Sequence, residues 1–429
     1  MSGNREHFGS RAAVIMAMAG SAIGLGNIWR FPYMVGEYGG AAFILVYILC
    51  SFVLSFPIFL SEAVIGRKTH SNAIGAMKKL APGSFWTSLG YLSVITPMII
   101  VSYYSIVGGW SIEYFFKSLT LNFGEFRPTG WTPLIFNTIF LALSSLVVAF
   151  GIKGGIEKFN KISIPVLFVL IVLIMVYSVN MPGADKGIDY LIKPDFSKLT
   201  GRTFAFALGQ SFYSMSLGMG IVITYSSYVK KDENLVASGV GTVVAALIFS
   251  VLAGFAIMPA VFSAGIAPSS GPGLVYQTLP HVFMGMGASS PVIATIVASL
   301  FFFSVVVAAM TSSISLIEVG VAYLVEEKGV KRSLACLLVF LVAWVLGLAS
   351  VFSIKAFGKV DAFSSNFLLT AGVLLVVLFV GWRMGKEDVR GEITNQGTVN
   401  KRVFGIFYFL IRYVAPITVL TIFVTNLAL

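Results

Sequence analysis

The stretch Gly20-Ser-Ala-Ile-Gly-Leu-Gly-Asn-Ile-Trp-Arg-Phe-Pro-Tyr33 decides the fold of this chain. It lies inside an apolar run over residues 12–35, which is long enough to span a bilayer at ~1.5 Å of helix per residue. Gly24 and Gly26 weaken a helix, and Pro32 lacks an amide donor. Because unpaired backbone groups are costly in hydrocarbon, a broken span is stable only where it lines a polar cavity.

The polar residues of the same stretch separate two explanations of its glycines. A glycine-rich helix packed closely on a neighbouring helix would explain Gly24 and Gly26, but it would explain neither Asn27 nor Arg30. Ionisable side chains inside a span are expensive and mark functional sites. The sequence therefore predicts that the first span is broken and lines a binding site near the middle of the membrane.

The composition places the chain among helical membrane proteins. Of its 429 residues, 57% are hydrophobic and 11% are charged, and the mean hydropathy is +0.91. Ordinary soluble domains carry ~25% charged residues, and the ~10-residue alternating segments of a membrane β-barrel are not visible. The first apolar run is too long for a signal-peptide core. We assign the net charge of +11 to cytoplasmic loops and expect no nucleic-acid partner.

The chain offers no constellation for catalysis. Cys50 and Cys336 lie in or beside apolar runs, and two such cysteines predict neither a disulfide framework nor a metal site. No cluster of His, Cys and carboxylate residues suggests metal chemistry, and no Ser/His/Asp set suggests hydrolysis. We therefore do not expect an enzyme.

Apolar runs predict about eleven membrane spans. They cover residues 12–35, 41–66, 89–116, 132–150, 162–180, 203–228, 235–262, 291–325, 333–353, 361–382 and 403–427. With the N-terminus inside, 19 of the 29 Lys and Arg residues fall in inside loops and 8 in outside loops. Cytoplasmic loops carry such an excess. We predict that the N-terminus is inside and, from the odd number of spans, that the C-terminus is outside.

A second interrupted helix suggests internal symmetry. Gly209-Gln-Ser-Phe-Tyr-Ser-Met-Ser-Leu-Gly-Met-Gly220 opens the sixth span, five spans after the first, so the two halves have opposite membrane orientation. Two Gly-interrupted segments at corresponding places in two halves are typical of secondary transporters. We expect a first repeat over residues 1–200, a second over 201–382, and a cytoplasmic loop with the eleventh span over 383–429.

Four stretches of the chain resemble the neurotransmitter:sodium symporter family, whose prokaryotic members are amino-acid transporters with the leucine-transporter fold. These stretches are Arg5-Glu-His7, residues 20–32, residues 209–220 and Thr311-Ser-Ser313. The resemblance implies an all-α polytopic membrane protein with a 5+5 inverted repeat and broken helices 1 and 6. Many relatives have a twelfth span, so a dimer surface built on that span is not implied, and the sequence predicts no oligomeric state.

The resemblance also implies a function. It predicts a symporter in the inner membrane of a prokaryote, embedded in the lipid bilayer, that imports an amino acid with one or two sodium ions by alternating access. The alternative is an ion- or ligand-gated channel or sensor on the same scaffold. The sequence shows no appended signalling domain, and this favours the symporter.

An amino-acid substrate needs an anion site, a cation site and an apolar slot. Half-helix N-termini offer amides to a carboxylate, and half-helix C-terminal carbonyls suit an ammonium. The resemblance places the amides at Leu25 and Gly26, with the Tyr104 hydroxyl beside them. The full expected substrate set is Ala22, Leu25, Gly26, Ile100, Tyr104, Tyr213, Ser214, Ser216, Met219, Ser312 and Leu316. Met219, where some relatives have Phe, favours a hydrophobic or aromatic amino acid.

Two sodium sites are implied by the resemblance. The second sodium site consists of the carbonyls of Gly20, Ile23 and Ala308 and the hydroxyls of Thr311 and Ser312. The first sodium site consists of the Ala22 carbonyl, the Asn27 amide oxygen, Ser214 and the substrate carboxylate. The family also supplies an Asn or Asp from the seventh span, but the corresponding residue is Ala246. We therefore expect a firm second site and a weak or absent first site.

An anion site is a further implication. Chloride-dependent relatives have a serine where Ser250 stands, with Tyr47, Gln210 and Ser214 as neighbours, and all four residues are present. Chloride-independent relatives often place a glutamate there. Chloride is thus a second candidate ion, although Ala246 removes a donor that such a site would also use.

Two gates are implied as well. Arg30 is expensive inside a membrane and needs a partner, and the family pairs it with Asp361 above an aromatic lid of Tyr104 and Tyr213. On the inside, the family pairs Arg5 with Glu326, with Tyr228 as a neighbour. Ion pairs in loops are worth ~0–1 kcal/mol, so they can break, as alternating access requires.

The fifth span carries one more motif. Gly155-Ile-Glu-Lys-Phe-Asn-Lys-Ile-Ser-Ile-Pro165 resembles the Gly-to-Pro motif that lets this span unwind and admit water to the second sodium site. Without the resemblance, the same residues are also compatible with an ordinary proline near a helix start.

Overall fold

The structure, a computed structural model, describes residues 6–265 and 273–428 and contains only helices, turns and loops in those ranges. Within them, nine helices are long and apolar enough to cross a membrane. They are Ala41–Thr69 (α3, Ala41–Cys50, to α4, Phe56–Thr69), α6 (Thr87–Ser118), α7 (Trp131–Ala149), Ile152–Val179 (with α8, Lys158–Val179), α12 (Leu235–Ser263), α14 (Pro291–Lys328), α15 (Arg332–Phe352), Ile354–Arg383 (α16, Ile354–Phe363, to α17, Leu369–Leu378) and Lys401–Val424 (α19, Lys401–Phe409, to α20, Ala415–Ala428).

The first span is bent where the glycines predicted a break. The helix α1 (Arg11–Ala22) and the helical segment Gly26–Tyr38, which ends in α2 (Phe31–Tyr38), meet at 52°. Ile23 between them has extended backbone angles, φ −96° and ψ 91°. Counted together, this pair makes a tenth membrane-crossing element in the described part of the chain.

The sixth span is interrupted, as the glycines and small polar residues of 209–220 predicted. Residues 203–228 form two short helices, α10 (Gly201–Ser214) and α11 (Ile221–Ser226), separated by residues 215–220. Neither helix alone is long enough to cross a bilayer at ~1.5 Å per residue. Gly218 and Gly220 have φ of +77° and +69°, which a helix cannot contain, so the helix ends before them.

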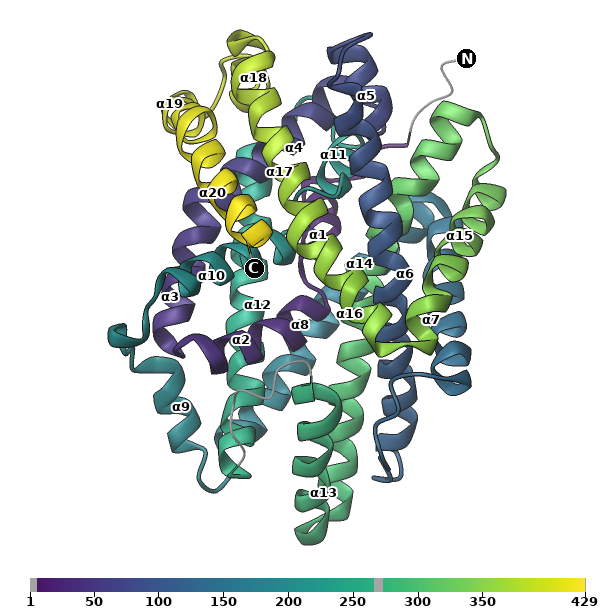
Figure 1. Cartoon of the computed structure of the whole chain (residues 1–429), viewed down its shortest axis with the longest axis vertical. Coiled ribbons are helices and arrows are strands. Elements are labelled where there is room, and N and C mark those ends of the chain that lie inside the picture. The colour runs from purple at the N-terminus through teal and green to yellow at the C-terminus, as the bar shows by residue number, and fades with distance from the viewer. Residues whose placement is uncertain (1–5, 266–272, 429) are drawn as a thin grey trace.

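Four short helices outside the spans were not predicted from the apolar runs. They are α5 (Ala73–Leu80), α9 (Asp185–Ile192), α13 (Leu279–Ser289) and α18 (Lys386–Ile393). The N-terminus, α5 and α18 lie at one end of the molecule, and α9 and α13 lie at the other (Figure 1). The loops therefore alternate between the two ends, as the predicted topology requires.

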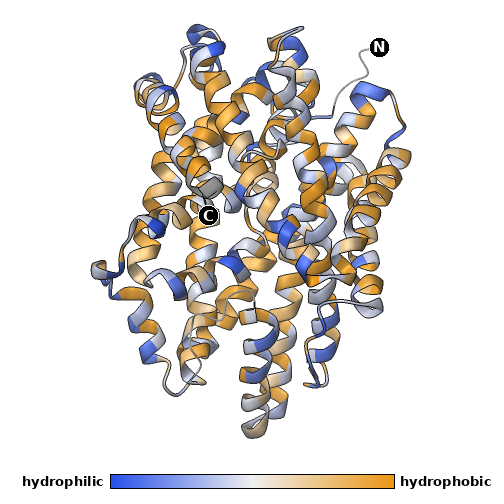
Figure 2. Ribbon diagram, viewed as in Figure 1, coloured by the Kyte–Doolittle hydropathy of each residue, from blue (hydrophilic) through white to orange (hydrophobic). Residues whose placement is uncertain are grey.

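The surface and the core are both apolar in the middle of the molecule. Figure 2 shows hydrophobic residues along the spans and hydrophilic residues gathered near the two ends. The long helix α14 lies among its neighbours and packs against α6, α7, α8 and α15, and it also contacts α1 and α11. This arrangement brings α14 beside both interrupted helices, α1 and α10–α11.

Candidate substrate and ion site

Side chains of α6 and α14 pack closely against the break in the first span. A Cβ added to Gly24 would lie 2.0 Å from the Ser312 hydroxyl oxygen and 3.2 Å from that of Tyr104. At Gly24 even a methyl group would therefore displace the side chains that face the break. The Leu25 amide donates to the Tyr104 hydroxyl oxygen at 3.2 Å, so two of the three residues that the resemblance assigned to the substrate carboxylate lie side by side.

The break in the sixth span is held by a carboxylate that sequence reasoning missed. Ser216, with φ of 55°, and Gly218 both turn the chain into the left-handed region. The Gly218 amide, which has no helical partner, donates to Glu62 at 2.7 Å, and Glu62 in α4 is completely buried. A charged residue inside the predicted second span was the available signal, because such residues are rare in spans and functional.

The two breaks face each other across one cavity. Side chains of α6 and α14 complete its walls between the two breaks. Its lining is Ser21, Ala22, Gly24, Gly26, Asn27, Ile100, Tyr104, Tyr213, Ser214, Ser216, Met219, Ile221, Ser312 and Leu316. The structure thus brings together every residue of the expected substrate set except Leu25, which is fully buried and reaches the site through its amide.

Ser21, Gly24 and Ile221 line the cavity but were absent from the expected set. The Ser21 carbonyl accepts from the hydroxyls of Ser216, at 2.9 Å, and Ser312, at 3.2 Å. It belongs to the last turn of α1, whose carbonyls lack intrahelical donors. The position of Ser21 at the end of a predicted half-helix could therefore have identified it as a residue of the site.

The residues of the predicted second sodium site converge on one side of the cavity. The Thr311 hydroxyl donates to the carbonyls of Ile23, at 2.9 Å, and Ala308, at 2.8 Å. The next residue, Ser312, reaches the first break as described above. Two of the predicted carbonyl ligands thus lie within hydrogen-bonding distance of the Thr311 hydroxyl, and such a group of oxygens suits a hard cation.

Asn27 lies at the centre of the predicted first sodium site. Its amide oxygen accepts from the Gly24 amide at 3.2 Å, and its amide nitrogen donates to Ser214, at 3.1 Å, and Ser250, at 2.7 Å. The Ala246 carbonyl also lies 3.4 Å from this nitrogen. Ala246 is buried at the site, and its methyl group offers no ligand.

The predicted anion residues are partly grouped. The Tyr47 hydroxyl lies 3.0 Å from the Ser214 oxygen and 3.4 Å from the Ser250 oxygen. Gln210 instead donates to the Gly26 carbonyl at 3.0 Å, and its own carbonyl oxygen is buried without a partner in the described residues. Tyr47, Ser214 and Ser250 therefore form one cluster around Asn27, with Gln210 bonded to the first break.

Comparison with known proteins identifies the chain at this point. A family model described as the sodium:neurotransmitter symporter family matches residues 5–127 and 130–429. The chain belongs to that family. It is 35% identical to the uncharacterized sodium-dependent transporter YhdH of Bacillus subtilis over 96% of each chain. It is also 35% identical to an uncharacterized sodium-dependent transporter of Haemophilus influenzae, over 99% of this chain and 98% of the relative.

A solved structure confirms the predicted fold of the symporter. The crystal structure of MhsT in complex with L-phenylalanine matches it with a TM-score of 0.88 and 35% identity, over 99% of this chain and 100% of that chain. The symporter thus has the leucine-transporter fold, as the motifs predicted. It is a multi-pass membrane protein that couples transport of a small molecule to sodium, and it is a transporter rather than an enzyme.

At one side of the cavity, the predicted outer gate of the symporter is not closed by an ion pair. The guanidinium of Arg30 lies over the Tyr213 ring, 4.9 Å from its centre. Asp361 accepts from the Ser365 hydroxyl at 3.2 Å and forms no ion pair with Arg30 within 4.0 Å. The resemblance pairs the two charges directly, whereas in this structure Arg30 contacts Tyr213 and Asp361 contacts Ser365.

At the end of the symporter where the N-terminus lies, Tyr228 bonds to a carboxylate that the sequence analysis did not name. Its hydroxyl donates to Glu318 at 2.7 Å, and Arg332 pairs with the same carboxylate. Glu326 accepts from the Asn72 amide at 2.7 Å, at the start of α5. Glu318 lies two turns before Glu326 on α14 and is completely buried. Arg5 lies outside the described residues.

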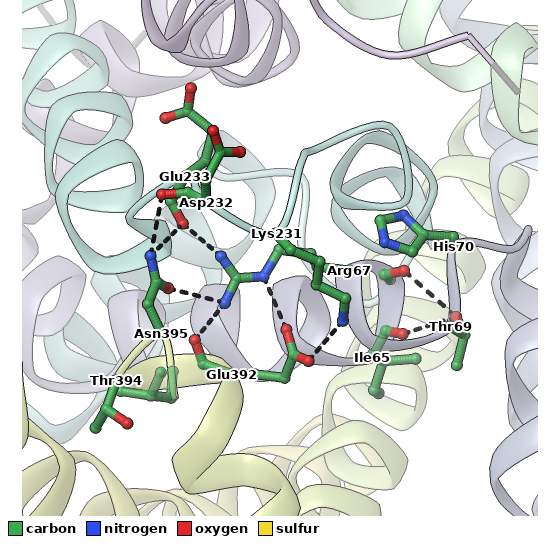
Figure 3. A network of polar contacts seen from close by, with 12 residues as sticks. Ile65, Arg67, Thr69, His70, Lys231, Asp232, Glu233, Glu392, Thr394 and Asn395 are labelled. Carbon is green, nitrogen blue, oxygen red and sulfur yellow. Dashed lines mark hydrogen bonds and ion pairs between the residues drawn. The ribbon is translucent and has the colours of Figure 1, made fainter. Parts of the chain in front are cut away.

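A buried ion-pair network lies at the same end of the symporter (Figure 3). Arg67 at the end of α4 pairs with Glu392 of α18 at 2.8 Å and donates to Asn395 at 3.2 Å. Lys231 reaches Glu392 at 2.7 Å. Burial alone would raise the pKa of Glu392, but Lys231 and Arg67 outweigh it and lower that pKa below its ordinary value. The carboxylate therefore stays ionised at neutral pH and ties α18 to α4 and to the loop before α12.

Proposed function

We propose that the symporter imports a hydrophobic or aromatic amino acid together with sodium by alternating access. The observation that carries the proposal is one cavity shared by two broken helices. Its lining combines residues of the two breaks, such as Ala22 and Ser216, with apolar side chains such as Ile100, Met219 and Leu316. Such a cavity suits a zwitterion with an apolar side chain. The MhsT structure, which holds L-phenylalanine, supports the same class of substrate.

Uptake into proteoliposomes tests this proposal. Purified protein would be reconstituted and offered each of the twenty amino acids with an inward sodium gradient or with an equal potassium gradient. We expect saturable uptake of at least one large apolar amino acid with sodium only. Uptake of no amino acid under a sodium gradient would contradict the proposal, and current without saturation would favour the channel alternative.

We further propose that the N-terminus faces the cytoplasm of a prokaryote and that the C-terminus faces outside. The excess of Lys and Arg in the loops at the end that carries the N-terminus supports this orientation. Movement of the two repeats, residues 1–200 and 201–382, relative to each other would then open the cavity to one side of the membrane at a time. An impermeant thiol reagent added outside should label Lys186→Cys, in the exposed part of α9, and should not label Ser84→Cys, after α5. The reverse pattern would contradict this orientation.

One prediction concerns the weak first sodium site. Ala246→Asn would add an amide oxygen beside Asn27, so we expect the affinity for sodium to rise about fivefold, the size of one polar contact. The Hill coefficient for sodium would rise from about one toward about two. Sodium titration of substrate binding is the measurement. Ala245→Asn is the control, because Ala245 is only half-buried and lies one position away.

The wild-type protein can contradict this prediction by itself. If it already shows steep two-ion dependence on sodium, and Asn27→Ala reduces that dependence to one ion, then the first site is firm without a ligand from Ala246. Replacing chloride by gluconate in the same titration would show whether the cluster of Tyr47, Ser214 and Ser250 holds an anion.

A second prediction concerns the outer gate. Asp361 lies outside the cavity lining, so its loss should disturb closure rather than the pocket. We expect Asp361→Ala to slow uptake about tenfold or more while the affinity for substrate changes less than about threefold. Uptake and equilibrium binding on the same preparation measure the two effects. Glu125→Ala, which removes an exposed carboxylate of the loop after α6, is the control. Equal loss of uptake and binding at normal expression would argue against a gate.

A further inference from the structure

Asn160 is a buried polar side chain that no part of the predicted site uses. It lies in the first turn of α8 and is completely buried. Both its amide oxygen and its amide nitrogen lack a hydrogen-bond partner in the described residues. Buried polar groups are almost always paired, and an unpaired one costs free energy, so this amide calls for an explanation.

The side chain of Asn160 lies against a predicted sodium ligand. A Cβ added to Gly20 would be 2.4 Å from the Asn160 amide oxygen and 3.1 Å from its nitrogen. Gly20 supplies a carbonyl to the predicted second sodium site, and α8 packs against both α1 and α14, the two helices that form this site. The absence of a side chain on Gly20 is what lets the amide approach the helix so closely.

Asn160 lies on the side of the predicted second sodium site that faces the end of the molecule with the N-terminus. Gly20 precedes Ile23 by three residues of α1, or ~4.5 Å along the helix axis, toward the end of the molecule where the N-terminus lies. The start of α8 lies at the same end, because the Gly9 amide donates to Glu157 at 3.0 Å. Asn160 therefore lies between the oxygens around Thr311 and that end of the molecule.

The helix that carries Asn160 has a weakened region on each side of this residue. It follows a short, widened helical turn over Ile152–Glu157 that contains Gly154 and Gly155. Pro165 lies inside α8 and cannot donate to the Lys161 carbonyl one turn earlier. Asn160 thus lies between two weak points of the helix, and a small movement there would carry its amide relative to α1.

We propose that Asn160 is a transient sodium ligand, which takes the ion from the second sodium site as it leaves toward the end of the molecule that carries the N-terminus. This inference rests on the proposed function. The amide oxygen is a suitable ligand for a hard cation, and because it carries no charge it does not trap the ion. An ion that passes Asn160 exchanges the carbonyls of the first break for the amide before it reaches water.

Release of radiolabelled sodium from the purified protein tests the proposal. A ligand that contacts the ion only between the site and water lowers the free-energy barrier for sodium binding and for sodium release alike. We therefore expect Asn160→Ala to slow sodium release about fivefold, the size of one polar contact, with equilibrium affinity unchanged within about twofold. Asn160→Asp should instead tighten equilibrium binding of sodium, because a fixed negative charge at this place holds the ion.

The control is Asn137→Ala in α7. Asn137 is also completely buried, and both atoms of its amide are unpartnered in the described residues. This variant should release sodium at the wild-type rate. If Asn160→Ala fails to fold, Asn160→Ser replaces it and should slow release as well.

Three results would overturn the inference. One is a wild-type release rate in Asn160→Ala, another is equal slowing in Asn137→Ala, and the third is unchanged affinity in Asn160→Asp. The failure of the proposed function is distinct, because then the wild-type protein would take up no amino acid under a sodium gradient, whereas the release of bound sodium would still be compared among the variants.

Discussion

Thr311→Ala combined with Ser312→Ala should abolish the dependence of substrate binding on sodium. The Thr311 hydroxyl contacts the carbonyls of Ile23 and Ala308, and Ser312 faces the same break through Ser21. Polar contacts to a charged group contribute about 1.5–3 kcal/mol each, so the loss of two should weaken sodium binding about a hundredfold or more. A sodium titration of substrate binding measures the effect, and thermal unfolding shows whether the variant is folded.

Ser313→Ala is the matched control for this double variant. Ser313 is the next residue of α14, is completely buried, and its hydroxyl has no partner in the described residues. Its removal deletes the same chemical group from the same helix without touching the predicted ion site. We expect a wild-type response to sodium. An unchanged sodium response in the double variant would remove Thr311 and Ser312 from the ion site.

The fold was predictable because its main features are local in the sequence. Long apolar runs predict spans wherever they occur, and the glycines at 20, 24 and 26 predict the bend that the structure shows. The glycines and small polar residues of 209–220 likewise predicted the break between α10 and α11. The left-handed conformation of Ser216 at this break was not predictable, because serine carries no local signal for it.

The grouping of site residues was predictable only where a long motif carries them. Ala22, Gly26, Ser214 and Ser312 come from such motifs, and the structure places them on one cavity. Glu62 and Glu318 lie outside the motifs, and their partners lie 156 and 90 residues away along the chain. Distant pairs leave no periodicity in one sequence, and for this reason the bond between Tyr228 and Glu318 was not predicted.

Asn160 lies inside a motif, but the motif does not reveal the position of its side chain. The sequence places it inside the Gly155–Pro165 motif, but nothing there says which way its amide points. Only the close approach to Gly20, across two helices, gives it a position beside the predicted second sodium site. The sequence therefore identifies a weak helix segment, and the structure identifies the side chain within it that can act.

Glu62→Ala should cost the symporter most of its affinity for substrate, whereas Glu62→Gln should keep it. The Gly218 amide has no helical carbonyl to bond, and Glu62 is its acceptor at 2.7 Å. Without an acceptor, this buried donor is left unpaired at a cost of about 1–3 kcal/mol. Alanine would also free residues 215–220, which carry Ser216 and Met219 into the cavity. We expect substrate affinity to fall about tenfold or more and the midpoint of thermal unfolding to fall as well.

The glutamine variant decides which property of Glu62 matters. A glutamine amide keeps an oxygen acceptor at nearly the same place but removes the carboxyl group and its ability to change charge. Binding close to wild type in Glu62→Gln would show that the hydrogen bond to Gly218 holds the break in place. Ser61→Ala is the control, because the Ser61 hydroxyl bonds only to the Pro57 carbonyl of its own helix. If Glu62→Gln loses binding as fully as Glu62→Ala, support of the Gly218 amide does not explain the buried carboxylate.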